Sequence, residues 1–469
     1  MSVRLGCGLA IAATLAAGCG STAQAATRTW TGTFRLPASG KPVSLSVVLA
    51  GTRATVALAP GHAGEQTVAA SVRRGRVRFA LPGRPARIVF DGRIRGSRIS
   101  GSVAQAKLRG SFRLVPGKAG VLPLLGVYRG SGGTAAMLVR PAGGFPPWLV
   151  ELPSGDVHGV GATLTVGTRI GDLSGGGTLR RDGARLFWTR AGGTTFYERV
   201  RLRQEEVRVG TLAGTLTLPE GQGPFPAVAM VHGSGPQGRD ELQTFVDFCA
   251  LHGIAVLAYD KRGNGQSGGL YPGERATPET VDVLARDAEA AARFLARQPE
   301  VDRTRVGLLG DSQAGWITAL AASREPAIRW AVLLVGPTID VGRTDDWASL
   351  AGKGLAPPSA PLDQLLAQVR KEAPFGFDPR PALARLTIPV FWIFGDSDRN
   401  ISTALSVDAL EALRPGHDFS WVVLGGTTHT LLDLPSGLNQ DIPASRGFAR
   451  GLYTSIEGWL SSHGIAASH

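Results

Sequence analysis

Residues 306–321 constrain the fold of this chain more than any other stretch, because they combine an apolar run, an abrupt turn at a serine and a helical pattern. The apolar run at 306–309 predicts a buried strand, and the spacing after the turn predicts a helix. Residues 310–315 read Gly-Asp-Ser-Gln-Ala-Gly, which is the Gly-x-Ser-x-Gly pattern with Ala314 in place of its last glycine. Such a turn exposes the serine hydroxyl beside the free N–H groups of the helix start, so Ser312 is a candidate nucleophile.

Apolar runs and helical patterns alternate from residue 204 to the end. Besides the serine strand, the predicted strands are 225–231, 254–259, 330–335, 388–394 and 419–424. The predicted helices are 242–251, one that follows the N-cap Thr277, and a final one that carries Phe448, Leu452, Ile456 and Trp459. Near-continuous apolar strands separated by helices indicate a mostly parallel sheet with helices on both faces. Ligands bind such sheets at the carboxyl ends of the strands, so reactive residues are expected in the loops there.

Two of these loops supply partners for Ser312. Asp398 follows the penultimate predicted strand, and His429 follows the last one. Asp396 is the second candidate, and Asp340 the third, for the carboxylate that orients the histidine. The chain order of serine, aspartate and histidine is that of α/β-hydrolase triads, and it differs from the orders in chymotrypsin-like and subtilisin-like enzymes.

The loop at 232–236 reads His-Gly-Ser-Gly-Pro and predicts an oxyanion site. Its glycines allow backbone N–H groups to approach a ligand closely, and such donors stabilise a developing negative charge. The histidine of this loop is expected to pack, and the next loop, 260–265, is expected to be held by ion pairs.

The first half of the chain has the pattern of short β-strands. Polar and apolar residues alternate, as in Arg-Val-Arg-Phe at 76–79, and Asp-Gly turns separate the runs. This pattern predicts a barrel or sandwich of one or two modules, at 26–118 and 119–203. No catalytic constellation lies here, so we expect this half to be a binding, spacing or docking element that precedes the catalytic domain at 204–469.

The net charge of +13 is unevenly distributed. Residues 26–203 contain 27 Lys and Arg against 7 Asp and Glu, whereas residues 204–469 contain 22 against 30. Such asymmetry fits contact with an anionic envelope surface, and it also fits arginines on the solvent face of alternating strands. A nucleic-acid partner is not expected, because the basic half has neither a recognition helix nor a platform of aromatic residues.

Residues 1–25 have the features of an export signal, with Arg4 before an apolar core and Ala-Gln-Ala at 23–25 as a cleavage site. The sequence before Cys19 also resembles a lipobox, which leaves a lipid-anchored form open beside a periplasmic or secreted one. The remaining cysteine, Cys249, is expected to be a buried apolar residue. No other stretch reaches the ~18 apolar residues of a membrane-spanning helix.

Several motifs together resemble one group of the α/β-hydrolase superfamily. They are Pro-Phe-Pro-Ala-Val at 224–228, His-Gly-Ser-Gly-Pro-Gln at 232–237, Tyr-Asp-Lys-Arg-Gly at 259–263 and Gly-Asp-Ser-Gln-Ala-Gly-Trp at 310–316. The group contains bacterial serine esterases related to the prolyl-oligopeptidase and dienelactone-hydrolase branches. The resemblance covers about residues 207–464, and it implies the roles of nucleophile, orienting carboxylate and base for Ser312, Asp398 and His429. It also implies oxyanion donors at the N–H of Gln313 and at that of Ser234 or Gly235.

The expected function is hydrolysis of small carboxylic esters through an acyl-enzyme, without cofactor or metal. A serine peptidase acting on aminoacyl or prolyl amides is the first alternative, and a non-catalytic envelope-binding protein is the second. Residues 341–386, between two predicted strands, are expected to form a cap that contains Trp347, Phe375 and Phe377. Those apolar residues are expected either to line an acyl pocket or to pack the cap itself.

Overall fold

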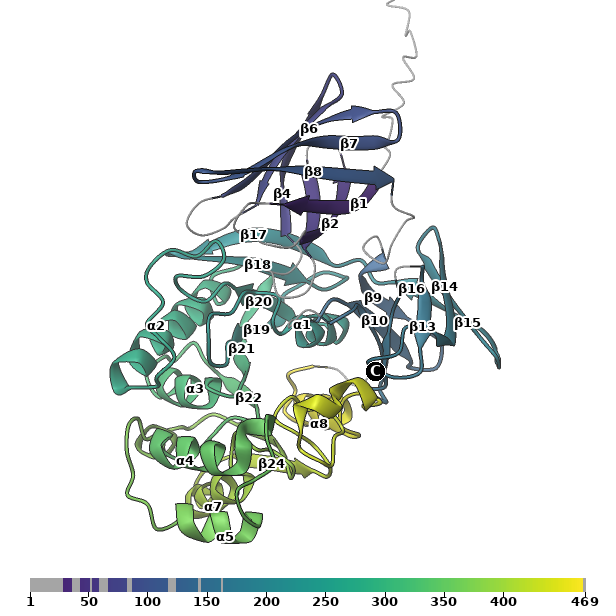
Figure 1. Cartoon of the computed structure of the whole chain (residues 1–469). Coiled ribbons are helices and arrows are strands. Elements are labelled where there is room, and N and C mark those ends of the chain that lie inside the picture. The colour runs from purple at the N-terminus through teal and green to yellow at the C-terminus, as the bar shows by residue number, and fades with distance from the viewer. Residues whose placement is uncertain are drawn as a thin grey trace, which may run out of the picture.

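The computed structural model describes residues 28–35, 43–50, 53–58, 66–81, 87–116, 124–141, 145–161 and 163–466. The predicted export signal, Cys19 and most of the segment between the two β modules lie outside the described residues. Three sheets organise the chain (Figure 1). The first two are all-β and the third has helices on both faces, so the predicted fold class is confirmed.

The first sheet is a closed barrel of eight antiparallel strands in sequence order. The strands are β1 (Arg28–Arg35), β2 (Val43–Ala50), β3 (Arg53–Leu58), β4 (Gln66–Arg73), β5 (Arg76–Leu81), β6 (Ile88–Arg95), β7 (Arg98–Gln105) and β8 (Leu108–Pro116). Alternate residues point inward, and four phenylalanines fill the interior with ring contacts around Phe90. The barrel is therefore a packed body whose interior has an aromatic core.

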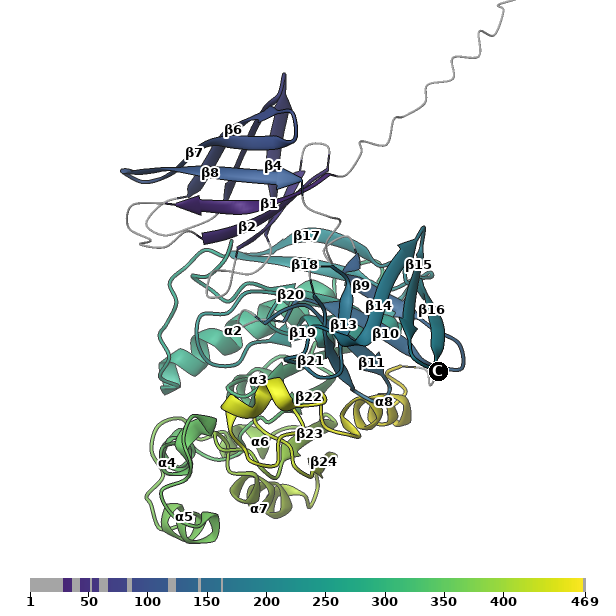
Figure 2. The same ribbon diagram turned by 45° about the vertical axis from the view of Figure 1, so that its right-hand side comes forward.

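The second sheet has the order β12-β11-β10-β9-β16-β15-β14-β13. Its strands are β9 (Gly126–Arg129), β10 (Ala135–Val139), β11 (Trp148–Leu152), β12 (Val157–Gly159), β13 (Thr165–Gly167), β14 (Gly175–Asp182), β15 (Arg185–Arg190) and β16 (Gly193–Arg199). One face shares a continuous hydrophobic core with the third sheet and its helices, and Trp148 packs edge-on against Phe448 there. Figure 2 shows this sheet lying against the helical part of the molecule.

The third sheet has the order β17-β18-β20-β19-β21-β22-β23-β24 and is parallel from β20 onward. Its strands are β17 (Arg203–Val209), β18 (Leu212–Leu218), β19 (Phe225–Val231), β20 (Ala255–Tyr259), β21 (Val301–Asp311), β22 (Trp330–Leu334), β23 (Val390–Gly395) and β24 (Phe419–Leu424). The predicted strands are all present, and most of their ends differ by two residues at most. The exception is the serine strand, β21, which begins five residues before the predicted run at 306–309 and ends two residues after it.

Helices cover both faces of this sheet. One face packs on α1 (Gln243–Leu251) and α8 (Leu452–Ser462), and the other on α2 (Pro278–Leu295), α3 (Ala314–Ala322), α6 (Arg380–Leu383) and α7 (Thr403–Leu413). Thr277 caps α2 as predicted, because its hydroxyl accepts a hydrogen bond from the N–H of Thr280. No helix in the described part of the chain is long and apolar enough to cross a membrane.

One helix boundary differs from the prediction. The helical spacing of apolar residues placed Phe448 in the last helix, but α8 begins at Leu452, and Phe448 pairs instead with Leu432 in an isolated β-bridge. Phe448 is buried because it packs against the second sheet, so its apolar character reports a tertiary contact rather than a helical face.

The segment between β22 and β23 contains α4 (Val341–Ala351), the 3-10 turn η3 (Gly352–Gly354), α5 (Leu362–Val369) and α6. Trp347 is buried with Ile339, Leu365 and Leu405, whereas Phe375 is 78% exposed. The aromatic residues of this segment are predicted from the sequence either to line an acyl pocket or to pack the cap itself. Trp347 packs within the segment.

The close packing of β21 against β22 predicts a stability difference between two glycines. A Cβ added at Gly307 would lie 2.1 Å from the buried ring of Trp330, whereas one added at Gly458, in α8, would meet nothing within 4 Å. We expect Gly307→Ala to lower the free energy of unfolding by about 1–3 kcal/mol. The matched control, Gly458→Ala, should raise it by about 0.5–1 kcal/mol. Urea unfolding followed by circular dichroism measures both, and equal stability of the two variants would contradict the packing argument.

Candidate functional site

Ser312 sits on a strained turn between β21 and α3. Its φ is +52°, a left-handed value that is uncommon for a residue with a side chain. The N–H of Ser312 donates to the Leu334 carbonyl, and the Ser312 carbonyl accepts from the N–H of Gly315. A Cβ at Gly310 would lie 2.4 Å from the Val231 carbonyl oxygen, so the turn requires glycine at that position.

Ala314, the departure from the usual motif, fits because of Gly310. A Cβ at Gly310 would lie 2.5 Å from the Ala314 methyl group, so the missing side chain at 310 makes room for the methyl at 314. Ala314 is fully buried at the start of α3. Helix α3 comes closest to the loop after β22 at Gly315, where a Cβ would lie 2.8 Å from the backbone of Gly336 and Pro337.

Three residues from separate loops meet at the carboxyl edge of the sheet. His429 Nε2 lies 3.0 Å from Ser312 Oγ, and His429 Nδ1 lies 2.8 Å from Asp398 Oδ2. The other carboxylate oxygen of Asp398 accepts hydrogen bonds from the backbone N–H groups of Asn400 and Ile401, at 2.7 and 2.9 Å. The carboxylate is therefore fixed from behind while it faces the imidazole.

The second and third candidate carboxylates have other partners. Asp396 is exposed and accepts from the Ser397 hydroxyl and the Thr427 N–H. Asp340 is buried and caps α4, where it accepts from the N–H groups of Arg343 and Phe375. Of the three, only Asp398 forms a hydrogen bond with His429.

The histidine is electrostatically prepared to accept a proton. Burial favours the neutral ring, but the charge and hydrogen bond of Asp398, together with the charge of Asp311, outweigh it and raise the pKa of His429. Burial also raises the pKa of Asp311. The charges of His429 and Lys261 and a hydrogen bond with the Gly233 backbone oppose this increase. The charges of two acidic residues, Asp398 and Asp311, thus both act on one imidazole.

The predicted oxyanion donors lie where the glycine-rich loop meets the start of α3. Gln313 is buried at the N-cap of α3, directly after the serine. Within the described part of the chain, the backbone N–H groups of Gln313 and Ser234 make no hydrogen bond. The buried hydroxyl of Tyr271 lies beside the backbone of Gly235 without a hydrogen bond of normal geometry. The glycine-rich loop and the start of α3 therefore each offer one backbone donor without a hydrogen bond.

Lys261 is the residue of this site whose role the sequence did not reveal. It is 2% exposed, and its ammonium donates to the carbonyls of Gly233 and Gly235 and to the side-chain oxygen of Gln313, at 2.7, 3.1 and 3.0 Å. Burial lowers the pKa of Lys261 to about 8, although the charge of Asp311 opposes the shift. One buried cation therefore connects the glycine-rich loop to the residue that follows Ser312.

The rest of the 260–265 loop is held by ion pairs, as predicted. Asp260 binds the Arg239 guanidinium through both oxygens, and Arg262 binds Asp287 in the same way. His232 packs edge-on against Tyr259, and burial, aided by Lys261, lowers the pKa of His232 to about 3. It is therefore a neutral packing residue, as expected.

The loop that carries His429 is braced by the second sheet. The chain that follows it, at 443–448, exchanges backbone hydrogen bonds with that sheet, including Val157 N–H to Arg446 carbonyl and Phe448 N–H to Gly155 carbonyl. The N–H of Ala449 then donates to the carbonyl of Leu431, two residues after His429. The β-rich half therefore contributes to the position of the histidine loop.

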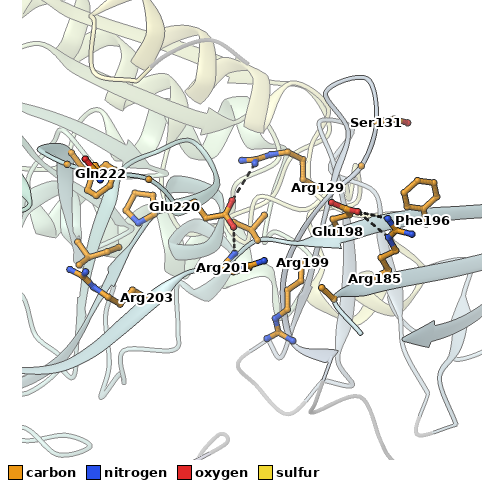
Figure 3. A pocket seen from close by; sticks show the side chains of 18 of the residues that line it. Arg129, Ser131, Arg185, Phe196, Glu198, Arg199, Arg201, Arg203, Glu220 and Gln222 are labelled. Atoms are coloured by element: carbon orange, nitrogen blue, oxygen red, sulfur yellow. Dashed lines mark hydrogen bonds and ion pairs between the residues drawn. The ribbon is translucent and has the colours of Figure 1, made fainter. Parts of the chain in front are cut away.

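A separate cavity of about 1340 Å³ lies where the second sheet meets the β18–β19 turn (Figure 3). None of its lining residues belongs to the Ser312 site. Arg185 pairs with Glu198, and Arg129 pairs with Glu220, whose carboxylate also accepts from the Arg201 backbone. The cavity therefore lies between the second sheet and the start of the third, and the Arg129–Glu220 pair connects the two. Among the described residues, no three His, Cys, Asp or Glu side chains form a metal-binding group.

Comparisons with known proteins agree with this geometry. The family described as serine aminopeptidase, S33, matches residues 222–372. Esterase EstD of Thermotoga maritima is 29% identical over 269 residues, which are 50% of this chain and 62% of that protein. The second half of this chain has the α/β-hydrolase fold, and its sequence is similar to that superfamily.

Two further relatives of this α/β-hydrolase domain differ in coverage. Human mitochondrial acyl-coenzyme A thioesterase 2 is 34% identical over 144 residues, which are 30% of this chain and 27% of the thioesterase. The chain therefore spans less than two thirds of either curated relative. A solved esterase of Pyrococcus furiosus is 19% identical with a TM-score of 0.40, and the match covers 56% of this chain and 93% of that one.

The raised pKa of His429 predicts the pH dependence of any hydrolysis by this α/β-hydrolase domain. Activity needs the neutral ring, so kcat/KM should fall on the acid side with a midpoint above the ordinary value of 6.5. Asp398→Asn removes the negative charge that contributes most to raising the pKa of His429, so the midpoint should move to lower pH while kcat falls by about 10⁴-fold. Asp396→Asn is the matched control and should stay within about threefold of wild type. A large loss in the control, with none in Asp398→Asn, would show that the orienting carboxylate is misassigned.

The contacts of Lys261 predict a second, separable effect. Lys261→Met leaves two buried acceptors and one part-buried acceptor without this donor, and we expect kcat to fall by about ten- to a hundredfold with a much smaller change in KM. A decline of wild-type activity above about pH 8 should be absent in this variant. The exposed Lys371→Met is the control, and pH–rate profiles measure both. Wild-type kcat in Lys261→Met would exclude a role for the ammonium in positioning the donors.

Proposed function

We propose that this hydrolase is a serine carboxylesterase that works through an acyl-enzyme intermediate. The observation that carries the proposal is the unbroken chain of hydrogen bonds from Asp398 through His429 to Ser312, beside two backbone N–H groups that make no hydrogen bond in the described structure. Similarity to an esterase over half of the chain supports the same reaction class.

The proposed reaction has two balanced steps. With its proton on Nδ1, His429 accepts the Ser312 proton at Nε2 while Oγ forms a bond to the ester carbonyl carbon. Asp398 stabilises the imidazolium, and the N–H groups of Gln313 and Ser234 stabilise the oxyanion. The alkoxide leaves with the proton from His429, and water, activated by the same histidine, then releases the acid and regenerates Ser312. Loss of one oxyanion donor typically costs about 2.7–4 kcal/mol of barrier.

An aminopeptidase is the second candidate, because the matching family is described in those words. Glu241 gives this alternative a specific basis. Burial, with the charges of Asp240 and Asp311, raises the pKa of Glu241 to about 7, and Asp311 directly precedes the serine. The carboxylates of Glu241 and Asp311 would favour a substrate with a cationic amino group near the reacting carbonyl. Aminoacyl amides therefore belong in the substrate panel beside esters and thioesters.

Turnover of short p-nitrophenyl esters tests the proposal. Ser312→Ala should lose activity by on the order of 10⁴- to 10⁶-fold, because no other residue forms the acyl intermediate. Ser323→Ala, at the end of α3, is the matched control and should remain active. A fluorophosphonate should label the wild type and the control, but not Ser312→Ala.

Two outcomes would contradict the proposal. Equal activity of wild type and Ser312→Ala would exclude this serine as the nucleophile. Rapid cleavage of aminoacyl amides with negligible ester turnover would assign the site to the peptidase alternative instead.

A further inference from the structure

The outer face of the barrel carries a concentrated positive charge. Exposed cationic side chains project from nearly every described strand or turn; they are Arg35, Arg53, Arg73, Arg74, Arg76, Arg78, Arg87, Arg93, Arg95, Arg98, Lys107, Arg109 and Arg113. Asp91 is the one acidic residue in the described part of the barrel. The aromatic core fills the interior, so any partner of the barrel binds on this outer face.

Strand register arranges four of these residues in a line. Arg73 of β4 lies opposite Arg76 of β5, and Arg76 lies opposite Arg93 of β6. Arg93 then lies opposite Ser100 of β7, which in turn lies opposite Arg113 of β8. We call Arg73, Arg76, Arg93 and Arg113 the arginine row. Neighbouring strands are about 4.8 Å apart, so the row extends about 19 Å around the barrel.

Most of the charge in the arginine row is not balanced within the protein. Arg76 forms a two-point ion pair with Asp91, and this pair lowers the pKa of that carboxyl group. In the described part of the chain, no carboxylate lies within ion-pair distance of Arg73, Arg93 or Arg113. Like charges directly opposite each other destabilise a strand pair, so the row gains from an anionic partner.

The shape of the row favours a flexible chain as the partner. It crosses five of the eight strands and therefore follows the curve of the barrel, so a flat membrane cannot contact both of its ends. Valines are the only large apolar side chains exposed on the described strands of the barrel, and aromatic side chains for base stacking are absent there. The strands β6 and β7 lie on the side away from β17, where a chain has access (Figures 1 and 2).

We propose that the arginine row binds a flexible, linear polymer of phosphate groups. Guanidinium groups bind phosphate oxygens through paired hydrogen bonds, and successive arginines along the row contact successive anionic groups. Binding releases counterions, so it weakens steeply with salt. This binding is independent of the esterase proposal, because the row lies on a separate sheet from Ser312.

Binding of the full chain to long-chain polyphosphate tests the proposal. The variant Arg73→Gln, Arg93→Gln, Arg113→Gln should bind about tenfold more weakly than wild type and show a shallower salt dependence. The control variant Arg303→Gln, Arg329→Gln, Arg450→Gln loses the same net charge from exposed positions in the α/β-hydrolase domain and should stay within about twofold. Unfolding midpoints and esterase rates report whether each variant is folded. If the triple variant fails to fold, the single variants Arg93→Gln and Arg113→Gln should each bind about twofold more weakly.

Stiff and flat anions provide the second arm of the experiment. Duplex DNA at equal phosphate concentration cannot bend around the barrel, and anionic vesicles present a plane, so both should bind more weakly than polyphosphate. The proposal is overturned if wild type does not bind polyphosphate. It is also overturned if the control variant loses as much affinity as the row variant, or if duplex DNA or vesicles bind as tightly with the same loss in the row variant.

Discussion

The left-handed backbone of Ser312 is the constraint on which the site depends. Such a conformation costs about 1–3 kcal/mol and persists only when the surroundings hold it in place. Here β21 and β22 fix the turn from one side, and α3 fixes it from the other. Glycines at 310 and 315 remove side chains where backbones touch, so the strain is supported by packing on both flanks of the serine. The hydroxyl therefore has a fixed direction before any substrate arrives.

Three buried or partly buried charged residues, Asp398, Lys261 and Asp311, support the groups around this turn. Asp398 faces the imidazole and is itself held by two backbone N–H groups. Lys261 joins the glycine-rich loop to Gln313, and the charge of Asp311 partly balances its ammonium. Because these groups are buried, their positions are coupled: the same low dielectric that strengthens each contact makes an unpaired neighbour costly. The preorganisation of the donors is thus a property of three loops together.

Sequence patterns predicted the elements well and the side-chain partners less well, for physical reasons. Apolar runs and caps define strands and helices locally, so the sheet, the cap of α2 and the order of Ser312, Asp398 and His429 followed from the chain alone. The choice between Asp398 and Asp396 depends on which carboxylate turns toward His429, and in the structure that carboxylate is Asp398. The contacts of Lys261 involve residues 26 to 52 positions away, and no local pattern encodes them. Phe448 packs against Trp148 of the second sheet, and its spacing from the apolar residues of α8 happens to match that of a helical face. The sequence pattern therefore could not distinguish this contact from a helix.

The hydrogen bonds between the second sheet and residues 443–448 give the chain an architecture that its sequence boundaries conceal. Residues 204–469 contain every group proposed to touch the substrate, yet their histidine loop is supported from outside that range. Excision at residue 204 would expose the shared core around Trp148 and Phe448 and leave backbone carbonyls and N–H groups of the supporting segment without partners. The smallest piece that can fold and keep its histidine loop in place is therefore larger than residues 204–469, and it begins upstream, in a part of the chain that supplies no group to the proposed site.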